Sequence, residues 1–156
     1  MGGHVVAPPH LRSTAHESPP PLSDNVNATT LSVSIERAPR EVSDFVSEPR
    51  NLPRWAAGLA RSVRPDGDSW IAETAQGPVR VRFAASNAFG VLDHYVRPVA
   101  GREIAVPMRV VPNGDGSEVL ITVFQQPEMT EAQYQQDLGL VKRDLERLKR
   151  VLEGTA

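Results

Sequence analysis

The chain has 156 residues, of which 40% are hydrophobic, 23% charged and 5% aromatic, and its formal net charge is −2 at pH 7. This size and composition are typical of one globular domain, and the slightly negative charge argues against a nucleic-acid partner, which requires clustered Lys and Arg. Because the sequence contains no Cys, disulfides, Cys-ligated zinc, iron–sulfur clusters and thiol catalysis are excluded.

The N-terminal part of the sequence predicts neither a membrane span nor a secretory signal. No apolar run approaches the roughly 20 residues of a membrane-spanning helix. The stretch MGGHVVAPP lacks a basic n-region and an apolar h-region, so we expect a cytoplasmic protein. Residues 1–28 are rich in Pro and show no hydrophobic period. We therefore expect a disordered tail over 1–28 and one domain over 29–153.

The domain is expected to begin with a strand over 29–36, where Leu31, Val33 and Ile35 alternate with polar residues. Two short helices follow, because Pro39 suits a first helical position and Asn51 can cap a second helix. Turn-forming residues then separate six further strands, which are predicted at 60–64, 69–74, 79–83, 90–96, 102–111 and 117–124. Such short spacings leave no room for crossover helices and predict antiparallel pairing.

A long helix is predicted to end the chain. Thr130 and Gln133 have the spacing of a capping box. Apolar residues then recur at steps of four and three, at Tyr134, Leu138, Val141, Leu145, Leu148 and Leu152. This stripe can cover one face of the sheet. The prediction is an α+β fold in which a seven-stranded antiparallel sheet curves around the C-terminal helix, with two short helices after the first strand.

Three local strings accompany this order of elements: NLPRWA at 51–56, FGVLDH at 89–94 and PMRVVPNG at 107–114. Over about residues 29–153 the chain resembles the START-like or SRPBCC superfamily, whose helix-grip fold includes Bet v 1-type proteins, polyketide cyclases and lipid-transfer domains. The strings are similar to those of bacterial members described as polyketide cyclase/dehydrase-like. The resemblance implies a cavity between sheet and helix that binds a small hydrophobic or aromatic molecule. It implies no single activity, because function resides in sites.

His94 is the candidate catalytic residue. Alternation along 90–96 places Leu92, His94 and Val96 on the buried face. An imidazole in apolar surroundings can act as an acid or base near neutral pH, whereas the alternative is a core histidine bonded to the backbone. Asp93 is expected on the opposite face, which weakens an Asp–His dyad. His94 is the only His of the domain, so we expect no multi-His metal site there and no cofactor.

The candidate ligand-binding residues are Trp55, Phe83, Asn87, His94, Met108, Arg109, Phe124 and Tyr134. Trp55 is expected either at the pocket mouth or as a core anchor. Simple alternation turns Arg109 outward, unless a bulge at Pro107 re-aims it to bind a ligand carboxylate or enolate.

Three functions remain open. The leading hypothesis is binding of a small hydrophobic molecule. The first alternative is a polyketide cyclase/dehydrase-like enzyme with His94 as acid or base, where Arg109 or Tyr134 stabilises an enolate. The second is a protein-interaction module that uses the basic residues Lys142, Arg143 and Arg147. A cavity filled by side chains would favour this last function. The oligomeric state, monomer or dimer, also stays open.

Overall fold

The computed structural model describes residues 25–58 and 60–154. The predicted tail therefore lies outside the described residues for positions 1–24. The helices are α1 (Pro39–Ser47), the 3₁₀ helix η1 (Pro49–Asn51), α2 (Leu52–Trp55) and α3 (Glu131–Glu153). The strands are β1 (Ala28–Ile35), β2 (Ser62–Asp66), β3 (Ser69–Thr74), β4 (Gly77–Phe83), β5 (His94–Pro98), β6 (Ile104–Val106), β7 (Met108–Asn113) and β8 (Gly116–Phe124).

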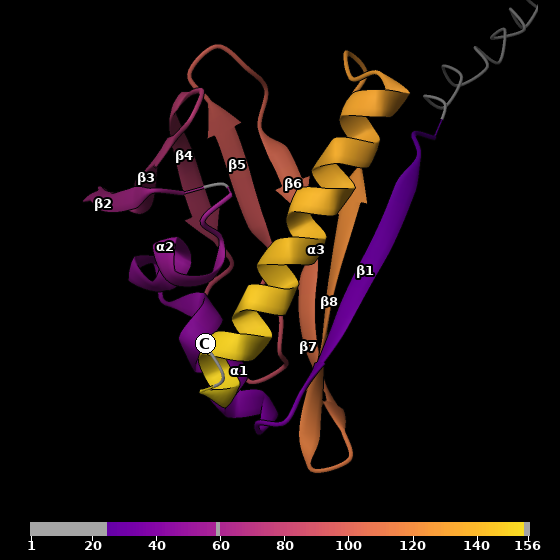
Figure 1. Ribbon diagram of the computed structural model, residues 1–156. Coiled ribbons are helices and arrows are strands. Elements are labelled where there is room, and N and C mark those ends of the chain that lie inside the picture. Colours follow the sequence, from indigo (N-terminus) through magenta and orange to yellow (C-terminus); the bar gives the residue numbers. More distant parts are fainter. Residues whose placement is uncertain (1–24, 59, 155–156) are drawn as a thin grey trace, which may run out of the picture.

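The eight strands form two antiparallel sheets, with the orders β1-β8-β7 and β2-β3-β4-β5-β6 (Figure 1). The sequence predicted a single sheet of seven strands, and this number of strands and sheets was wrong. The predicted strand 102–111 is divided at Pro107, and the chain passes from β6 in one sheet to β7 in the other. The reason is that Pro has no N–H to continue a ladder. Its carbonyl accepts a hydrogen bond from Thr122 N at 2.9 Å.

The two sheets remain joined by the segment that precedes β5. Leu92 N donates to Met108 O and Val110 N donates to Gly90 O, each at 2.9 Å. The predicted strand 90–96 is thus only partly correct, because its first residues pair with β7 and the regular strand β5 begins at His94. Gly90 has φ +72°, a conformation that favours glycine. A Cβ at this position would also clash with the Val110 carbonyl oxygen.

The helix ends follow the predicted chemistry. Pro39 opens α1, where its missing N–H costs nothing. At α3, Thr130 Oγ1 accepts from Gln133 N at 3.2 Å, and the Gln133 side chain accepts from Thr130 N at 2.9 Å. This capping box satisfies donors at the start of the helix. Gly154, with φ +71°, ends the helix in a left-handed conformation.

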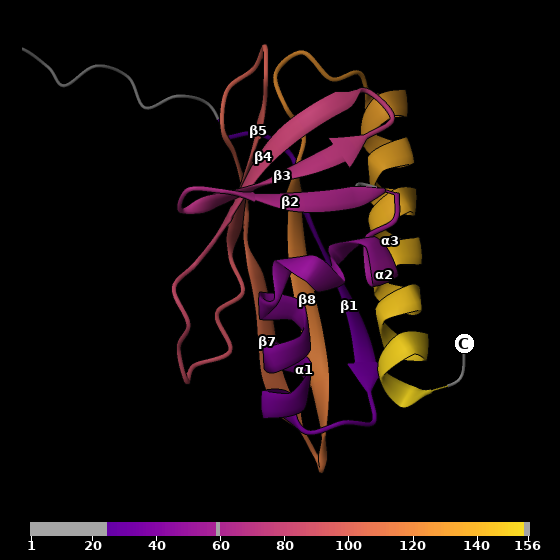
Figure 2. The ribbon, with the colours of Figure 1, turned by 90° about the vertical axis from the view of Figure 1, so that its left-hand side faces the viewer.

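The core lies between the sheets and α3. Leu145 and Leu148 of α3 pack in one buried cluster with Val81, Val110 and Val119 of the strands. Each fully buried aliphatic side chain stabilises the fold by roughly 1.5–3 kcal/mol. Figure 2 shows α3 along one side of the molecule, with both sheets on the other and α1 and α2 at one end between them. This is the predicted helix-grip arrangement.

Candidate functional site

Cross-strand pairing defines one surface of the five-stranded sheet that turns towards α3. The register aligns Phe83 with His94 and His94 with Val106. Directly paired residues project to the same face. We call this set the inner surface, and its members are Val79, Val81, Phe83, His94, Val96, Ile104 and Val106. Val81 belongs to the core cluster that contains Leu145 of α3, which establishes that the surface faces the interior.

The inner surface is only partly covered by the rest of the protein. Val81 and His94 are buried, whereas the other members of the surface are half-buried. On α3, Leu145 and Leu148 are buried, but Leu138 and Leu140 in the first half of the helix are only half-buried. Apolar side chains of the sheet and of the first half of α3 therefore remain partly accessible.

Two hollows stand out in the described part of the chain, and neither lies between the inner surface and α3. One lies between α1 and residues 83–92 and holds about 20 Å³, which is room for a water molecule. The other is an open depression of about 240 Å³ beside Asn25–Asn27 and Gln125–Met129. Neither hollow is therefore the cavity between sheet and helix that the resemblance implies.

His94 is 5% exposed, and its ring packs against Phe83 with a centroid distance of 5.2 Å. Its Nδ1 lies 3.1 Å from the Leu92 carbonyl oxygen. A carbonyl only accepts, so Nδ1 carries the hydrogen and Nε2 keeps its lone pair. Burial lowers the pKa of His94 more than the Leu92 hydrogen bond and the Asp93 charge raise it. The ring is therefore neutral near pH 7, with a basic nitrogen that has no hydrogen-bond partner among the described residues.

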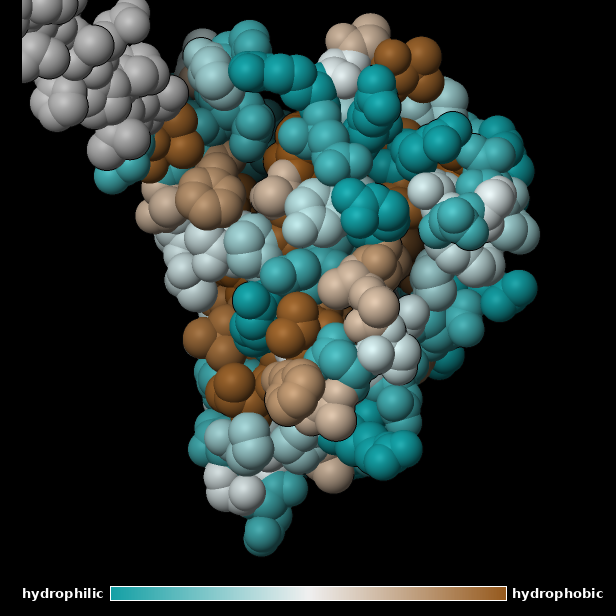
Figure 3. All heavy atoms as spheres, turned by 180° about the vertical axis from the view of Figure 1, so that it is seen from behind, coloured by the Kyte–Doolittle hydropathy of each residue, from teal (hydrophilic) through white to brown (hydrophobic). Residues whose placement is uncertain are grey.

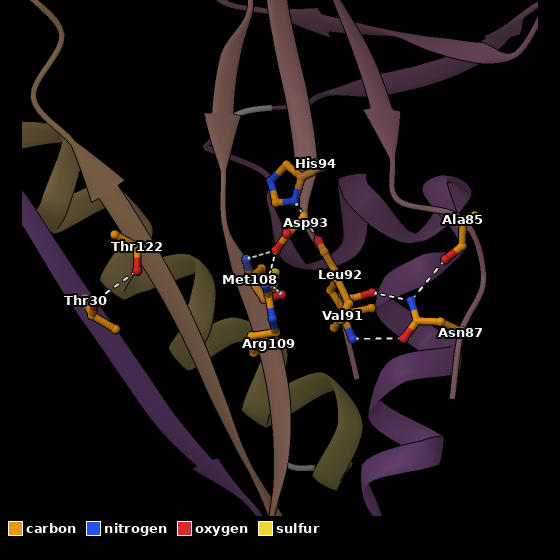
Figure 4. Close-up of polar contacts among 10 residues, drawn as sticks. All are labelled: Thr30, Ala85, Asn87, Val91, Leu92, Asp93, His94, Met108, Arg109 and Thr122. Carbon is orange, nitrogen blue, oxygen red and sulfur yellow. Dashed lines mark hydrogen bonds and ion pairs between the residues drawn. The ribbon is translucent and has the colours of Figure 1, made fainter. Parts of the chain in front are cut away.

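Asp93 and Arg109 lie on the opposite face, as simple alternation predicts. Asp93 Oδ1 accepts a hydrogen bond from Met108 N at 2.9 Å and forms an ion pair with Arg109 (Figure 4). The Arg109 side chain is 45% exposed. The inward orientation considered for Arg109 is thus not adopted, because Pro107 marks a change of sheet and not a bulge that reverses the face. Neither residue completes a dyad with His94.

Asn87 organises the loop between β4 and β5. Its Nδ2 donates to Ala85 O and Val91 O at 3.0 and 2.9 Å, and its Oδ1 accepts from Phe89 N and Val91 N at 2.9 and 3.2 Å. Figure 4 shows this side chain between the backbones of Ala85 and Val91. Its polar atoms are therefore occupied by the loop, which assigns Asn87 a structural role.

The remaining candidates divide between the interior and the outer face. Met108 is fully buried in the core. The Tyr134 hydroxyl lies 2.8 Å from Thr29 Oγ1 and 2.9 Å from Val123 O, so it joins α3 to the three-stranded sheet. Phe124 falls on the outer face, in the same alternating row of β8 as Thr122, opposite the buried Val119 and Ile121. It does not line the interior.

The outer face is a mixed surface and not a second apolar groove. Figure 3 shows hydrophobic and hydrophilic side chains interleaved across this side of the molecule. Phe89 is 84% exposed and Val111 is also exposed, whereas Arg109, Thr30 and Thr122 add polar groups. The outward candidates Arg109 and Phe124 therefore lie apart from the inner surface.

Asp144 is a polar group of the interior that pattern reasoning missed. This half-buried residue of α3 accepts a backbone hydrogen bond from Gly58. Burial raises its pKa to about 6, while the Gly58 hydrogen bond and the Arg147 charge oppose that shift. Its position, three residues after Val141 and four before Leu148, placed it next to the apolar stripe. That position beside the stripe is the feature of the sequence that could have indicated a partly buried carboxyl at Asp144.

Within residues 25–58 and 60–154 there is neither a candidate metal site nor a candidate membrane span. No group of three or more His, Asp or Glu side chains gathers there as a metal site would require. None of the described helices is long and apolar enough to cross a membrane.

Comparison with known proteins identifies the fold. A START superfamily protein from Mycobacterium smegmatis has a TM-score of 0.65 at 11% identity, covering 83% of this chain and 99% of that chain. The Aha1 dimer from Colwellia psychrerythraea has a TM-score of 0.66 at 11% identity, covering 83% and 98%. Ara h 8.0201 has a TM-score of 0.60 at 10% identity, covering 83% and 99%.

These similarities confirm the START-like helix-grip fold that the sequence predicted. No curated protein matches the chain. A family model described as polyketide cyclase/dehydrase and lipid transport matches residues 28–153, and the chain therefore belongs to that family.

Proposed function

We propose that the domain binds a small apolar molecule between the inner surface and the first half of α3. The observation that carries this proposal is the half-buried state of apolar side chains on both sides, including Val96 and Ile104 on the sheet and Leu138 on α3. A ligand that covers them gains the free energy of apolar burial, about 25 cal/mol per Å². Family membership supports the same proposal.

The charge distribution favours an uncharged ligand. Among the described residues, His94 is the one titratable member of the inner surface, and burial keeps it neutral. Arg109, which would pair with a ligand carboxylate, lies on the outer face beside Asp93. A buried ligand carboxylate would therefore lack a counter-ion, which is costly.

A titration with the neutral fluorescent probe N-phenyl-1-naphthylamine tests this proposal. Saturable fluorescence enhancement is expected for the natural chain and at least roughly tenfold weaker binding for Ile104→Asp, which places a charge on the inner surface. Val99→Asp is the matched control, because Val99 is 83% exposed and its substitution leaves binding unchanged. Thermal melting of each variant verifies folding. If the probe binds all three proteins equally, or shifts no methyl resonance of Val96 or Leu138, the proposal is wrong.

A second candidate function is proton abstraction by His94, which the neutral ring and the unpartnered Nε2 favour. In this step a C–H bond next to a ligand carbonyl breaks, Nε2 takes the proton, and the electron pair forms an enolate. Proton–deuterium exchange of 2-acetylnaphthalene in D₂O provides the assay. Catalysed exchange is expected to follow one group whose pKa is below 6.5 and to disappear in His94→Ala. Exchange at the uncatalysed rate, with binding intact, would leave binding as the function.

A further inference from the structure

Trp55 holds a buried hydrogen-bond donor that the protein does not satisfy. The side chain is 3% exposed, and its indole Nε1 is the one buried side-chain nitrogen or oxygen of the described residues without a hydrogen-bond partner. Buried polar groups are nearly always paired, and an unpaired one requires an explanation. The explanation required here is an acceptor that the protein itself does not supply.

No acceptor among the described residues forms a hydrogen bond with the Trp55 indole nitrogen. The buried neighbours along the chain, Leu52, Ala56 and Ala60, have apolar side chains. The Leu52 carbonyl accepts from Ala56 N at 2.7 Å, and the Ala56 carbonyl accepts from Ala60 N at 2.8 Å. The short helix therefore places an indole in the interior without a built-in partner.

The position of Trp55 connects it to the interior that the proposed ligand enters. Trp55 belongs to the same buried cluster as Ala72 and Val81 of the sheet and Leu145 of α3. Its helix α2 packs against α3, and Figure 1 shows α2 beside α3 at the end of the five-stranded sheet. The indole thus lies in the core that the inner surface and α3 share.

We infer that the Trp55 indole N–H donates a hydrogen bond to the bound ligand, so that the ligand is an apolar molecule carrying a neutral acceptor oxygen, as in a ketone, ester or quinone. This inference rests on the proposed function. A small number of placed polar groups fixes orientation in an otherwise apolar site. A donor that contacts the ligand selects the oxygenated molecule over its hydrocarbon analogue, because the hydrocarbon leaves the indole unpaired.

The experiment compares two probes of nearly equal shape, 2-acetylnaphthalene and 2-isopropenylnaphthalene. The first has a carbonyl oxygen where the second has a methylene group. Dissociation constants are measured for the natural chain and for Trp55→Phe, which keeps an aromatic ring and removes the donor. Desolvating the carbonyl costs the same in both proteins, so the change in the ratio of the two constants isolates the indole–carbonyl interaction. One neutral hydrogen bond predicts a change of roughly tenfold.

Trp70→Phe is the matched control, because the chain has two Trp residues and the Trp70 ring is covered by the Arg50 guanidinium at 4.9 Å. This variant is expected to keep the ratio of the natural chain. It also leaves Trp55 as the single indole, which assigns its ¹⁵N–H resonance. That resonance provides a second measurement if Trp55→Phe does not fold: the ketone shifts it downfield and the hydrocarbon does not.

The outcomes separate the inference from the function on which it rests. Loss of the ketone preference in Trp55→Phe, together with the ketone-specific indole shift, supports the inference. Binding of both probes with the same ratio in all proteins and an unmoved indole resonance overturns the inference and leaves apolar binding intact. Binding of neither probe overturns the proposed function and the inference together.

Discussion

Asp144→Asn is expected to stabilise the protein above pH 6. Asp144 is half-buried on α3, and burial raises the pKa of its carboxyl to about 6 from the ordinary value of 3.8. A raised pKa in the folded state means that folding favours the protonated carboxyl. Its contribution to the free energy of unfolding is therefore fully present below the unfolded pKa, near 3.8. This contribution is lost as the pH rises through about 6.

The size of the effect follows from the shift in pKa. A difference of 2.2 units, from 3.8 to about 6, corresponds to about 3 kcal/mol at 1.36 kcal/mol per unit. Because the carboxyl is only partly buried, solvent screening reduces this value to about 1 kcal/mol. Asparagine removes the charge and retains an oxygen that accepts the Gly58 hydrogen bond. The expected gain at pH 7.5 is therefore about 1 kcal/mol, with no gain at pH 4.

Urea denaturation at pH 4, 6 and 7.5 measures this difference. The natural chain is expected to lose stability relative to Asp144→Asn as the pH rises across that range. Glu146→Gln is the matched control, since Glu146 is exposed on the same helix and its substitution is expected to change little at any of these pH values. A destabilised Asp144→Asn at pH 7.5, or a constant difference between the two proteins at all three pH values, would refute the reasoning.

Three further substitutions test the fold. Gly90→Ala should lower the melting temperature by several degrees, because it forces a Cβ against a β7 carbonyl oxygen. Gly114 is the control, since it also has a positive φ but lies in open space, and Gly114→Ala should cost about 1 kcal/mol. Leu148→Ala, at a fully buried position, should destabilise the protein by about 2–5 kcal/mol in urea denaturation, and Val99→Ala by less than about 0.5 kcal/mol. Asn87→Ala removes four loop hydrogen bonds and should accelerate amide hydrogen exchange in 87–91, while unchanged exchange there would show that the loop is held by other contacts.

Local patterns predicted most individual elements correctly. The alternation of Leu31, Val33 and Ile35 identified β1, and the capping pair Thr130 and Gln133 identified the start of α3. These features depend on neighbouring residues, so the sequence carries them directly. The division at Pro107 was missed because a continuous apolar alternation runs through it. Only the pairing of β6 with β5 and of β7 with β8 assigns its two halves to different sheets.

The candidate site was predictable only in part. The period of two correctly turned His94 inward and Asp93 outward. Phe124 was wrongly included among the lining residues, because it was chosen for its apolar character, whereas the period of two along β8 puts it on the outer face. Asn87 was proposed for the pocket, but its hydrogen-bond partners in the loop are visible only once that loop has its conformation.

The sequence by itself determined the class of fold, the stripe of α3 and the inward direction of His94, because periods of 2 and 3.6 and capping pairs are properties of short segments. The tertiary structure alone decided which interior groups acquire partners. Asp144 meets Gly58, and Asp93 holds Arg109 on the outer face. The Trp55 indole meets no protein acceptor among the described residues. Burial and hydrogen bonding of these groups depend on segments far apart in the chain, which no local pattern records.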